Sequence, residues 1–456
     1  MTQSTNFNPD EFQGKSRKSI NTTIYLKILA IVILALLLLI PTSMVSNLVR
    51  ERQNNQVEAI SEVSSKWGGD QTITGPFISI PYYSFKTSNG DEASSEKKIR
   101  YRHFLHILPN RLNITGEVSP EKRNRGIFEV IVFGSQINLK GDFVLPELES
   151  LDIDSANVDW EKAELIVGIG DLRGIEKQVQ VKWNGQGALF NPGVNNKDLV
   201  SSGISVSIPI SYDAKDNLVF DIDLDLKGSQ KLYFVPVGKV TDVKINSNWP
   251  NPSFNGAFLP DTRTVTPNGF NANWNILNLN RNFPQFWIGN KFETATSSFG
   301  IDLVMPVDNY LKAYRSIHYA ILFIGFTFLA FFFIENLNKV NIHIVQYILV
   351  GAALVIFYTL LLSISEQLNF NLAFLIAAIM TIGLIAWYVK SVLQSTRFSV
   401  VISTLLISLY FFIFVIIQLQ DYSLLIGSLG IFSILGITMY FSKKIDWYQL
   451  PEKSED

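Results

Sequence analysis

The segment Gly168–Gly174, "GIGDLRG", places an acid and a base two residues apart, where they could pair or hold a ligand. Its glycines predict a strand that ends in a turn, with Asp171 and Arg173 on that turn. The segment lacks the full G-x-G-x-x-G fingerprint that precedes a helix in dinucleotide-binding sites. We therefore expect a structural ion pair between Asp171 and Arg173, and keep ligand binding as the alternative.

Two further groups have residue types that bind metals. Asp221, Asp223 and Asp225 alternate with apolar residues in "FDIDLDLKG", so in a strand the three carboxylates share one face. A calcium site also draws ligands from a loop, and we therefore interpret the row as the solvated face of a half-buried strand. His103 and His106 stand three residues apart in "YRHFLHILP" and would point to opposite faces of a strand. Neither group predicts a metal site.

Sequence motifs for catalysis are missing. The chain has no G-x-S-x-G, no phosphate-binding loop and no H-E-x-x-H. It contains no cysteine, which excludes thiolate metal sites and cysteine nucleophiles. We expect a protein that is not an enzyme and that uses no cofactor and no metal. Carboxylates that meet in space would still permit a periplasmic hydrolase, which is our third hypothesis.

The segment Ser247–Asp261, "SNWPNPSFNGAFLPD", combines three prolines with the large apolar rings of Trp249, Phe254 and Phe258. The prolines restrict the backbone, so the segment suits neither a helix nor a central strand. If it is buried, it is an ordered corner that joins two sheets, and if it is exposed, it is a patch for a partner. We favour the corner and predict that Trp249 is buried. The candidate binding residues are Trp249, Phe254, Phe258, Asp171 and Arg173.

Composition indicates a membrane protein. The 456 residues are 47% hydrophobic and only 17% charged, and the mean hydropathy is +0.20. A formal net charge of -2 gives no sign of a nucleic-acid partner. Residues 24–44 are apolar over about the 20 residues that cross a bilayer. A cleaved signal peptide would need a small-residue cleavage site after this segment, and none follows it. We therefore expect an uncleaved anchor, with a kink at Pro41.

The middle of the chain changes its period. After the anchor, a helical stripe of apolar residues continues to Gly68 and Gly69, where the helix should end. From about residue 71 to residue 304, short runs rich in Val, Ile and Phe alternate with polar residues and turn signals. This pattern predicts a large antiparallel β-rich domain, sandwich-like and of one lobe or two.

The last third predicts a cluster of five transmembrane helices. The expected spans are Ile317–Ile334, Ile344–Leu362, Leu372–Val389, Phe398–Ile417 and Tyr422–Phe441. Gly427 and Gly430 should allow close helix packing in the last span. The basic residues of the short connections would all lie on one side, with Lys339, Lys390, Arg397, Lys443 and Lys444 inside.

The fold class is therefore a membrane protein of mixed α and β structure. We expect a disordered cytoplasmic tail over residues 1–19, an anchor over 24–44, an extracytoplasmic domain over 45–316, five transmembrane helices over 317–441 and a cytoplasmic tail over 442–456. The first hypothesis is support of the cell envelope by non-catalytic binding through the extracytoplasmic domain. The centres of the spans hold no Asp, Glu, Lys, Arg or His, so transport of a lipid or an envelope precursor is the second hypothesis.

Several long segments resemble one family. They include "LVRERQNNQVEAISEVSSKWGGDQTITGPFISIPY", "DLRGI", "GSQKLYFVPVGKVT", "SNWPNPSFNGAFLPD" and "FGIDLVMPVDNYLKAYRSIHYAILFI". In these words the chain resembles the inner membrane protein CreD family, which is associated with the integrity of the bacterial cell envelope. The resemblance implies a multi-pass inner membrane protein and supplies no catalytic residue. The expected partners are membrane lipids and an unidentified envelope protein or glycan, with the oligomeric state open.

Overall fold

The structure is a computed structural model of the 456-residue chain. It describes residues 22–88, 97–151, 153–208, 210, 212, 218–303, 309–338, 340–419 and 422–444. Most of the tails expected at residues 1–19 and 442–456 lies outside these ranges. The chain forms two compact units, of which one comprises Met1–Asn54 with Asp308–Asp456 and the other Asn55–Val307. We call them the helical unit and the β unit.

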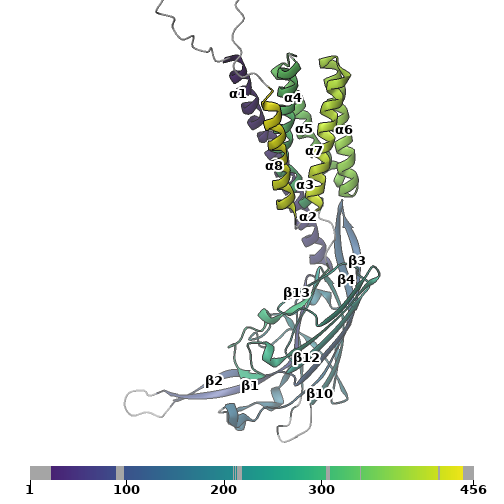
Figure 1. The fold of residues 1–456 in the computed structure, drawn as a ribbon. Coiled ribbons are helices and arrows are strands. Elements are labelled where there is room, and N and C mark those ends of the chain that lie inside the picture. The colour runs from purple at the N-terminus through teal and green to yellow at the C-terminus, as the bar shows by residue number, and fades with distance from the viewer. Residues whose placement is uncertain are drawn as a thin grey trace, which may run out of the picture. The chain divides into compact units, whose positions relative to one another are not determined.

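The described helices are drawn in Figure 1. They are α1 (Thr22–Leu37), α2 (Leu39–Trp67), α3 (Asn309–His318), α4 (Ala320–Asn338), α5 (Ile344–Ser365), α6 (Phe370–Leu393), α7 (Thr396–Gln418) and α8 (Ser423–Ser442). The described residues include six helical segments long and apolar enough to cross a membrane, the first of them Tyr25–Trp67. The predicted anchor and the five C-terminal spans are thus confirmed as elements.

The boundary between α1 and α2 lies at Leu38, three residues before Pro41. Pro41 has no backbone N–H, so the carbonyl of Leu37 loses its donor in the next turn and the helix is interrupted there. The interruption lies one turn before Pro41, and a bend of the helix axis there stays a prediction. The extension of the helix to Gly68 is confirmed, because α2 ends at Trp67 and Gly68 has a φ of +146°.

The first C-terminal span begins later than expected. Residues 309–318 form a separate short helix, α3, and the apolar helix α4 starts at Ala320 rather than at Ile317. Helix α3 belongs to the helical unit and buries Tyr310, Ala313 and Ile317, while its other face is polar. A helix of ten residues with one buried face is too short to stand out from the apolar segment that follows it.

The β unit contains two sheets (Figure 1). The nine-stranded sheet, sheet A, has the path β13-β17-β11-β1-β5-β9-β8, with β2 paired to β1 and β16 paired to β2. Its strands are β1 (Gln71–Ser88), β2 (Lys97–Ile107), β5 (Glu164–Ile169), β8 (Asn191–Pro192), β9 (Gly203–Ser207), β11 (Lys231–Val235), β13 (Pro252–Gly256), β16 (Phe286–Ile288) and β17 (Phe299–Leu303).

The eight-stranded sheet, sheet B, has the order β14-β15-β12-β3-β4-β10-β6-β7. Its strands are β3 (Arg111–Arg125), β4 (Phe128–Phe143), β6 (Gln180–Trp183), β7 (Gln186–Leu189), β10 (Leu218–Ser229), β12 (Val240–Ser247), β14 (Thr262–Thr266) and β15 (Gly269–Leu277). Both sheets are antiparallel apart from one parallel pair each, β1 with β11 and β12 with β3.

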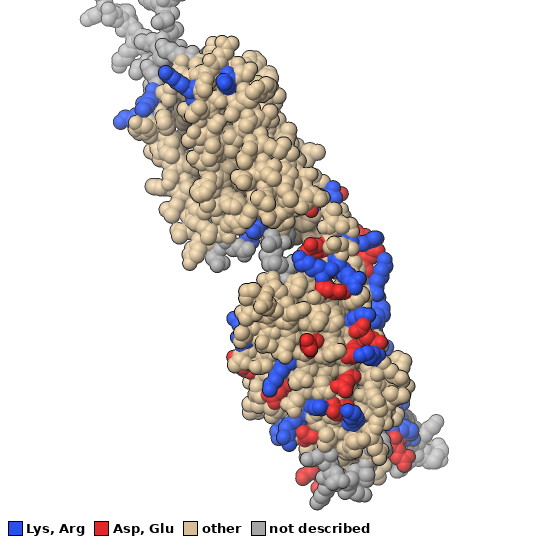
Figure 2. Space-filling model, turned by 90° about the vertical axis from the view of Figure 1, so that its right-hand side faces the viewer, with Lys and Arg blue, Asp and Glu red and all other residues tan. Residues whose placement is uncertain are grey.

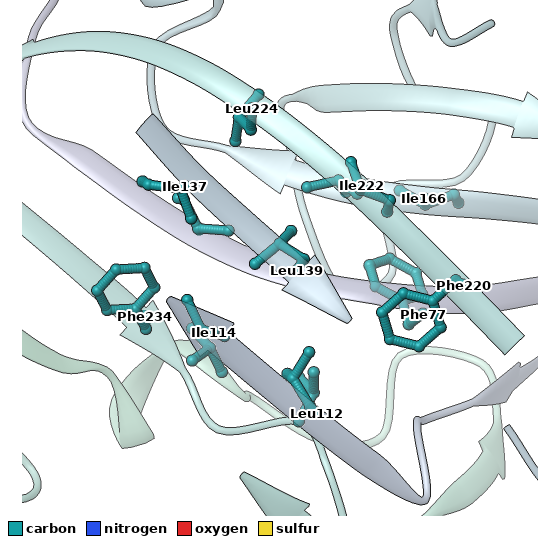
Figure 3. Packing of buried hydrophobic residues seen from close by; sticks show 14 of the residues in the cluster. Phe77, Leu112, Ile114, Ile137, Leu139, Ile166, Phe220, Ile222, Leu224 and Phe234 are labelled. Carbon is teal, nitrogen blue, oxygen red and sulfur yellow. The ribbon is translucent and has the colours of Figure 1, made fainter. Parts of the chain in front are cut away.

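One hydrophobic cluster lies between the two sheets and makes the β unit a single sandwich. Phe77, Ile166 and Phe234 of sheet A belong to the same cluster as Leu139 and Phe220 of sheet B (Figure 3). Several strands of sheet B alternate between exposed and buried residues, as the pattern eBeBeBeBe at the start of β3 shows, where B is buried and e is exposed, whereas β5 of sheet A is buried along nearly its whole length. Inward residues are apolar, and outward residues give sheet B a polar outer face.

Candidate binding site

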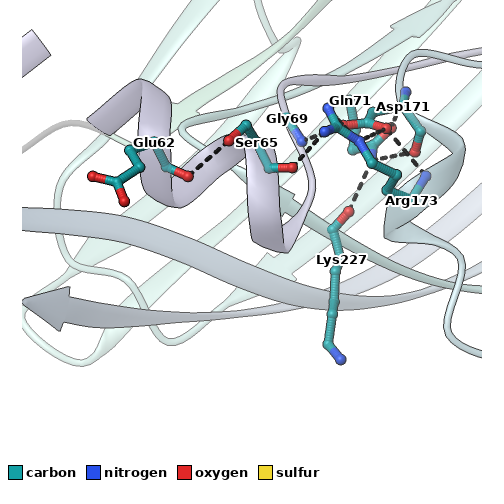
Figure 4. Close-up of polar contacts among 7 residues, drawn as sticks. All are labelled: Glu62, Ser65, Gly69, Gln71, Asp171, Arg173 and Lys227. Carbon is teal, nitrogen blue, oxygen red and sulfur yellow. Dashed lines mark hydrogen bonds and ion pairs between the residues drawn. The ribbon is translucent and has the colours of Figure 1, made fainter. Parts of the chain in front are cut away.

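Asp171 and Arg173 form the expected ion pair, and they form it where α2 ends against the β unit (Figure 4). The guanidinium of Arg173 donates to the Asp171 carboxylate at 2.8 and 2.9 Å and also to the carbonyl oxygen of Ser65 in the last turn of α2. The same carboxylate accepts the N–H of Gly69 at 2.8 Å. The pair therefore fixes the connection between the end of α2 and the start of strand β1.

The Arg173 guanidinium lowers the pKa of Asp171 to about 2, and the backbone N–H groups of Gly69 and Arg173 act in the same direction. Gln71, which is fully buried, donates to the carbonyl oxygens of Asp171 and Lys227 at 3.0 and 2.8 Å. Asp171, Arg173 and Gln71 thus use their polar groups to connect α2, β1 and β10, and they offer few groups to a ligand.

The segment Ser247–Asp261 is an ordered corner, as predicted. It leaves sheet B at the end of β12, forms strand β13 at the edge of sheet A, and returns to sheet B at β14. Trp249 and Phe254 are each only 9% exposed. The Phe254 ring packs edge-on against Phe270 at 5.7 Å and Trp274 at 5.9 Å, centroid to centroid.

Phe258 is half-buried with its ring edge-on to Phe299 at 5.9 Å. The three rings thus join the sheets, and Trp249 and Phe254 do not form a surface patch.

The aspartate row lies as expected, with Asp221, Asp223 and Asp225 pointing outward while the residues between them are buried. Asn138 of β4 bridges two of the carboxylates, donating to Asp221 at 2.8 Å and to Asp223 at 2.7 Å. Lys177 pairs with Asp225 at 2.5 Å. In the part of the chain that the structure describes, no three His, Asp or Glu side chains gather as a metal site would require.

The two histidines of β2 lie in different surroundings. His103 is exposed and hydrogen-bonds Ser84, whereas His106 is fully buried and its Nε2 lies 3.1 Å from Asp198. Burial lowers the pKa of His106, and Asp198 opposes this effect in part. The His106 Nδ1 atom has no hydrogen-bond partner among the described residues.

A polar groove on the outer face of sheet B is the candidate binding site. It has a volume of about 580 Å³ and crosses β12, β3, β4 and β10. We call it the sheet groove. Its polar lining side chains are Thr115, Glu117, Gln136, Asn138, Lys177, Asp223, Asp225, Lys244 and Asn246. The volume is within the range of small-molecule sites, and the recess opens widely to solvent, so one stretch of a polymer could enter it.

Five of these side chains are available to a ligand. Thr115, Glu117, Gln136, Lys244 and Asn246 make no side-chain hydrogen bond or ion pair to other described residues. Between them they offer hydroxyl, carboxylate, ammonium and two amide groups, which is a balanced set of donors and acceptors. Such a set suits a ligand that is rich in hydroxyl and amide groups, as glycans and peptides are.

A second recess continues the sheet groove. It has a volume of about 330 Å³ and shares Glu117 and Asn246 with the first. Its other polar lining residues come from β3, β12, β14, β15 and the turns beside them, and include Ser119, Asn248, Thr264 and Asn271. The two recesses together make a polar track across six strands of sheet B.

Sequence reasoning found only part of this site. It placed Asp223 and Asp225 on an outer face but did not identify Glu117, Lys244 or Asn246. These residues occupy ordinary outward positions of strands far apart in the chain, and only the pairing of β3 with β4 and β12 brings them together. Amide and hydroxyl residues recur at the outward positions of β12 and β15, and this was the available signal.

Comparison with known proteins adds two findings. The family model described as Inner membrane protein CreD matches residues 23–448. The chain is also 31% identical over 420 residues to the Inner membrane protein CreD of Escherichia coli (strain K12), and the match covers 91% of both chains.

Proposed function

The chain belongs to the CreD family of inner membrane proteins, and from this premise we propose that it supports cell-envelope integrity by non-catalytic binding in the periplasm. The ligand is a glycan-containing envelope polymer, and the sheet groove is the binding site. The single observation that carries the proposal is the set of five polar side chains in that groove without partners among the described residues.

The charge of the short connections supports a periplasmic β unit. Lys390 ends α6, Arg397 begins α7, and Lys443 and Lys444 follow α8, and the helix order puts all of them at one end of the helical unit. Ser399 of α7 donates to the carbonyl oxygen of Ala386 in α6, which joins two helices at that end. Under the positive-inside rule this end faces the cytoplasm. The β unit is connected through the opposite ends, which would place it in the periplasm.

The surroundings of the groove carboxylates favour recognition over hydrolysis. Asp225 is paired with Lys177, and Asp223 accepts a hydrogen bond from Asn138. A hydrolase of the two-carboxylate type needs one acid that holds a proton and one that does not, in distinct environments. Two of the three carboxylates in the groove are already engaged by the ammonium of Lys177 or the amide of Asn138, so among the described residues only Glu117 is left for a ligand.

Pelleting with purified peptidoglycan sacculi tests the proposal on the full chain in detergent. The double variant Gln136→Ala, Asn246→Ala removes two amides from the groove. Each lost hydrogen bond is worth about 0.5–1.5 kcal/mol, so we expect the affinity to fall about tenfold. The matched control is Gln180→Ala, Gln186→Ala, which removes two exposed amides of sheet B outside both recesses.

The control should bind like the parent protein. Equal binding by both double variants, or no sedimentation of the parent with sacculi, would contradict the groove as the binding site. Release of soluble fragments from the sacculi would instead show hydrolysis and contradict the non-catalytic part of the proposal.

A further inference from the structure

A second hollow lies within the helical unit, between α1, α4 and α8. It has a volume of about 310 Å³ and is lined by apolar side chains, with only the hydroxyls of Thr438 and Ser442 among them. Val32 of α1, Gly325 and Phe332 of α4 and Thr438 of α8 mark its walls. We call it the helix groove.

The groove stays open because α8 is attached to its neighbours at few points. Gly430 lies against the Phe412 ring of α7, so closely that an added Cβ would be 1.9 Å from the ring. Phe441, near the end of α8, stacks against Phe333 of α4 at 5.8 Å. None of the apolar window of α8 is buried within the chain. Between these attachments the helices leave a space that nothing in the described chain fills.

The helices around the groove determine what can occupy it. All three belong to segments long and apolar enough to cross a membrane, so the groove lies at the depth of the acyl chains. At Gly325 a Cβ atom would meet no described atom within 4 Å. The missing side chain therefore deepens the groove, where a lipid chain can take its place.

A positive charge lies at one end of this apolar groove. Ser442 lines it, and the next residues, Lys443 and Lys444, are both exposed. The Lys444 ammonium lies 4.7 Å from the centre of the Tyr440 ring, and the ammonium of Lys443 has no partner among the described residues. Lys27, in the first turns of α1, is already paired with Glu335. Among the described residues beside this end of the groove, Lys443 and Lys444 are thus the cations left for an anion.

We propose that the helix groove binds an anionic phospholipid, with one acyl chain between α1, α4 and α8 and the phosphate beside Lys443 and Lys444. Basic residues where transmembrane helices meet the cytoplasmic surface are the usual site for anionic headgroups. This site goes beyond the proposed function and uses no residue of the sheet groove, so either proposal can fail without the other.

The test uses the full chain in phosphatidylcholine nanodiscs that contain phosphatidylglycerol with a photoactivatable acyl chain. Crosslinked residues are mapped by mass spectrometry. We expect adducts concentrated on the residues of the helix groove. Gly325→Leu fills the groove with a side chain and should therefore remove most of these adducts. Leucine is a good helix former, so the substitution should leave α4 helical. Gly383→Leu is the matched control, since Gly383 of α6 also has open space at its Cβ position.

The charge is tested in the same system. Lys443→Gln with Lys444→Gln should lower the labelling by phosphatidylglycerol about tenfold or more, whereas Lys390→Gln with Arg397→Gln should leave it unchanged. Photoactivatable phosphatidylcholine should label the groove weakly in every variant.

Several outcomes would overturn the proposal. These are adducts spread evenly over the lipid-facing helices, equal effects of the two leucine variants, or equal labelling by the two lipids. Crosslinks that join two protein chains at Val32, and that Gly325→Leu abolishes, would show that a second copy of the chain occupies the groove in place of a lipid.

Discussion

Trp249 shows how one side chain can stabilise the β unit without taking part in binding. Its ring belongs to the core, and its indole N–H donates to the carbonyl oxygen of Asn251 at 3.1 Å. Trp249→Ala should cost about 3–5 kcal/mol in the free energy of unfolding, since it leaves a large cavity.

Thermal unfolding of the full chain, followed by the β-sheet circular dichroism signal, measures this loss. Leu259→Ala is the control, because Leu259 lies in the same corner with 66% of its surface exposed, and it should change stability by less than about 0.5 kcal/mol. A Trp249 variant that melts like the parent would reject the buried corner.

His106 predicts a dependence of stability on pH. The unfolded chain takes up a proton near the ordinary histidine pKa of about 6.5, whereas burial lowers the pKa of His106 in the folded state. The unfolded state then binds more protons between the two values. Stability should therefore fall as the pH drops below about 6.5, by at most about 1.4 kcal/mol per pH unit, and level off below the folded value.

Unfolding of the full chain in denaturant from neutral to mildly acidic pH measures this slope. His106→Asn should flatten it, and His103→Asn, which changes the exposed histidine of the same strand, should not. Identical slopes for the two variants would show that His106 is not the group responsible.

At the scale of single residues, the sequence predicted what local chemistry decides. The pairing of Asp171 with Arg173, the burial of Trp249 and the outward row of Asp221, Asp223 and Asp225 all follow from spacing and from strand alternation. It could not predict that Arg173 also caps α2 through the Ser65 carbonyl oxygen, because that contact joins segments 108 positions apart in the chain.

At the scale of elements, α8 gives the sharpest prediction, and it includes a correction. Both glycines of "IGSLGIF" were expected to allow close packing, but only Gly430 touches a neighbouring helix, and Gly427 has no described atom within 4 Å of its Cβ position. They lie three residues apart, roughly on one face of the helix but almost one turn apart along it, so Gly430 can meet the Phe412 ring while Gly427 lies beyond its reach. Gly430→Leu should destabilise the contact with α7 by about 1–3 kcal/mol, while Gly427→Leu should be nearly neutral.

The melting temperatures of the two leucine variants in detergent compare these effects directly. A Gly427 variant that is as unstable as the Gly430 variant would mean that α8 packs through its other face.

The type of each long element could be predicted, but the order of the strands could not. Hydrophobic length identifies the membrane helices, and alternation identifies strands such as β10. The parallel pairs β1 with β11 and β3 with β12 join segments more than 100 residues apart, and the local pattern of a strand does not specify its partner.

At the scale of the whole molecule, the proposed orientation predicts which loops a reagent outside the membrane can reach. The chain has no cysteine, so single replacements can be labelled without background. In spheroplasts an impermeant maleimide should label Gln367→Cys, between α5 and α6, and should leave Asn338→Cys and Ser395→Cys unlabelled until the membrane is lysed. The reverse labelling pattern would show that the chain has the opposite orientation in the membrane.

The two units also differ in the distribution of their charged side chains. On the face that Figure 2 shows, acidic and basic side chains are interspersed over the β unit, whereas the helical unit is nearly free of charge between its ends. The sequence predicted this division from composition alone. It did not predict the sheet groove, whose lining comes from four strands and a loop that only the fold brings together.

The most direct test of periplasmic binding through the sheet groove compares the labelling of two cysteines in intact, permeabilised cells and in spheroplasts stripped of wall glycan. Asn246→Cys lies in the groove, and Lys182→Cys is exposed on the same sheet outside it. We predict that the impermeant maleimide labels both in spheroplasts, and that in intact cells only Asn246→Cys is protected. Equal labelling of Asn246→Cys in cells and spheroplasts, or no labelling of either cysteine in spheroplasts, would contradict the account.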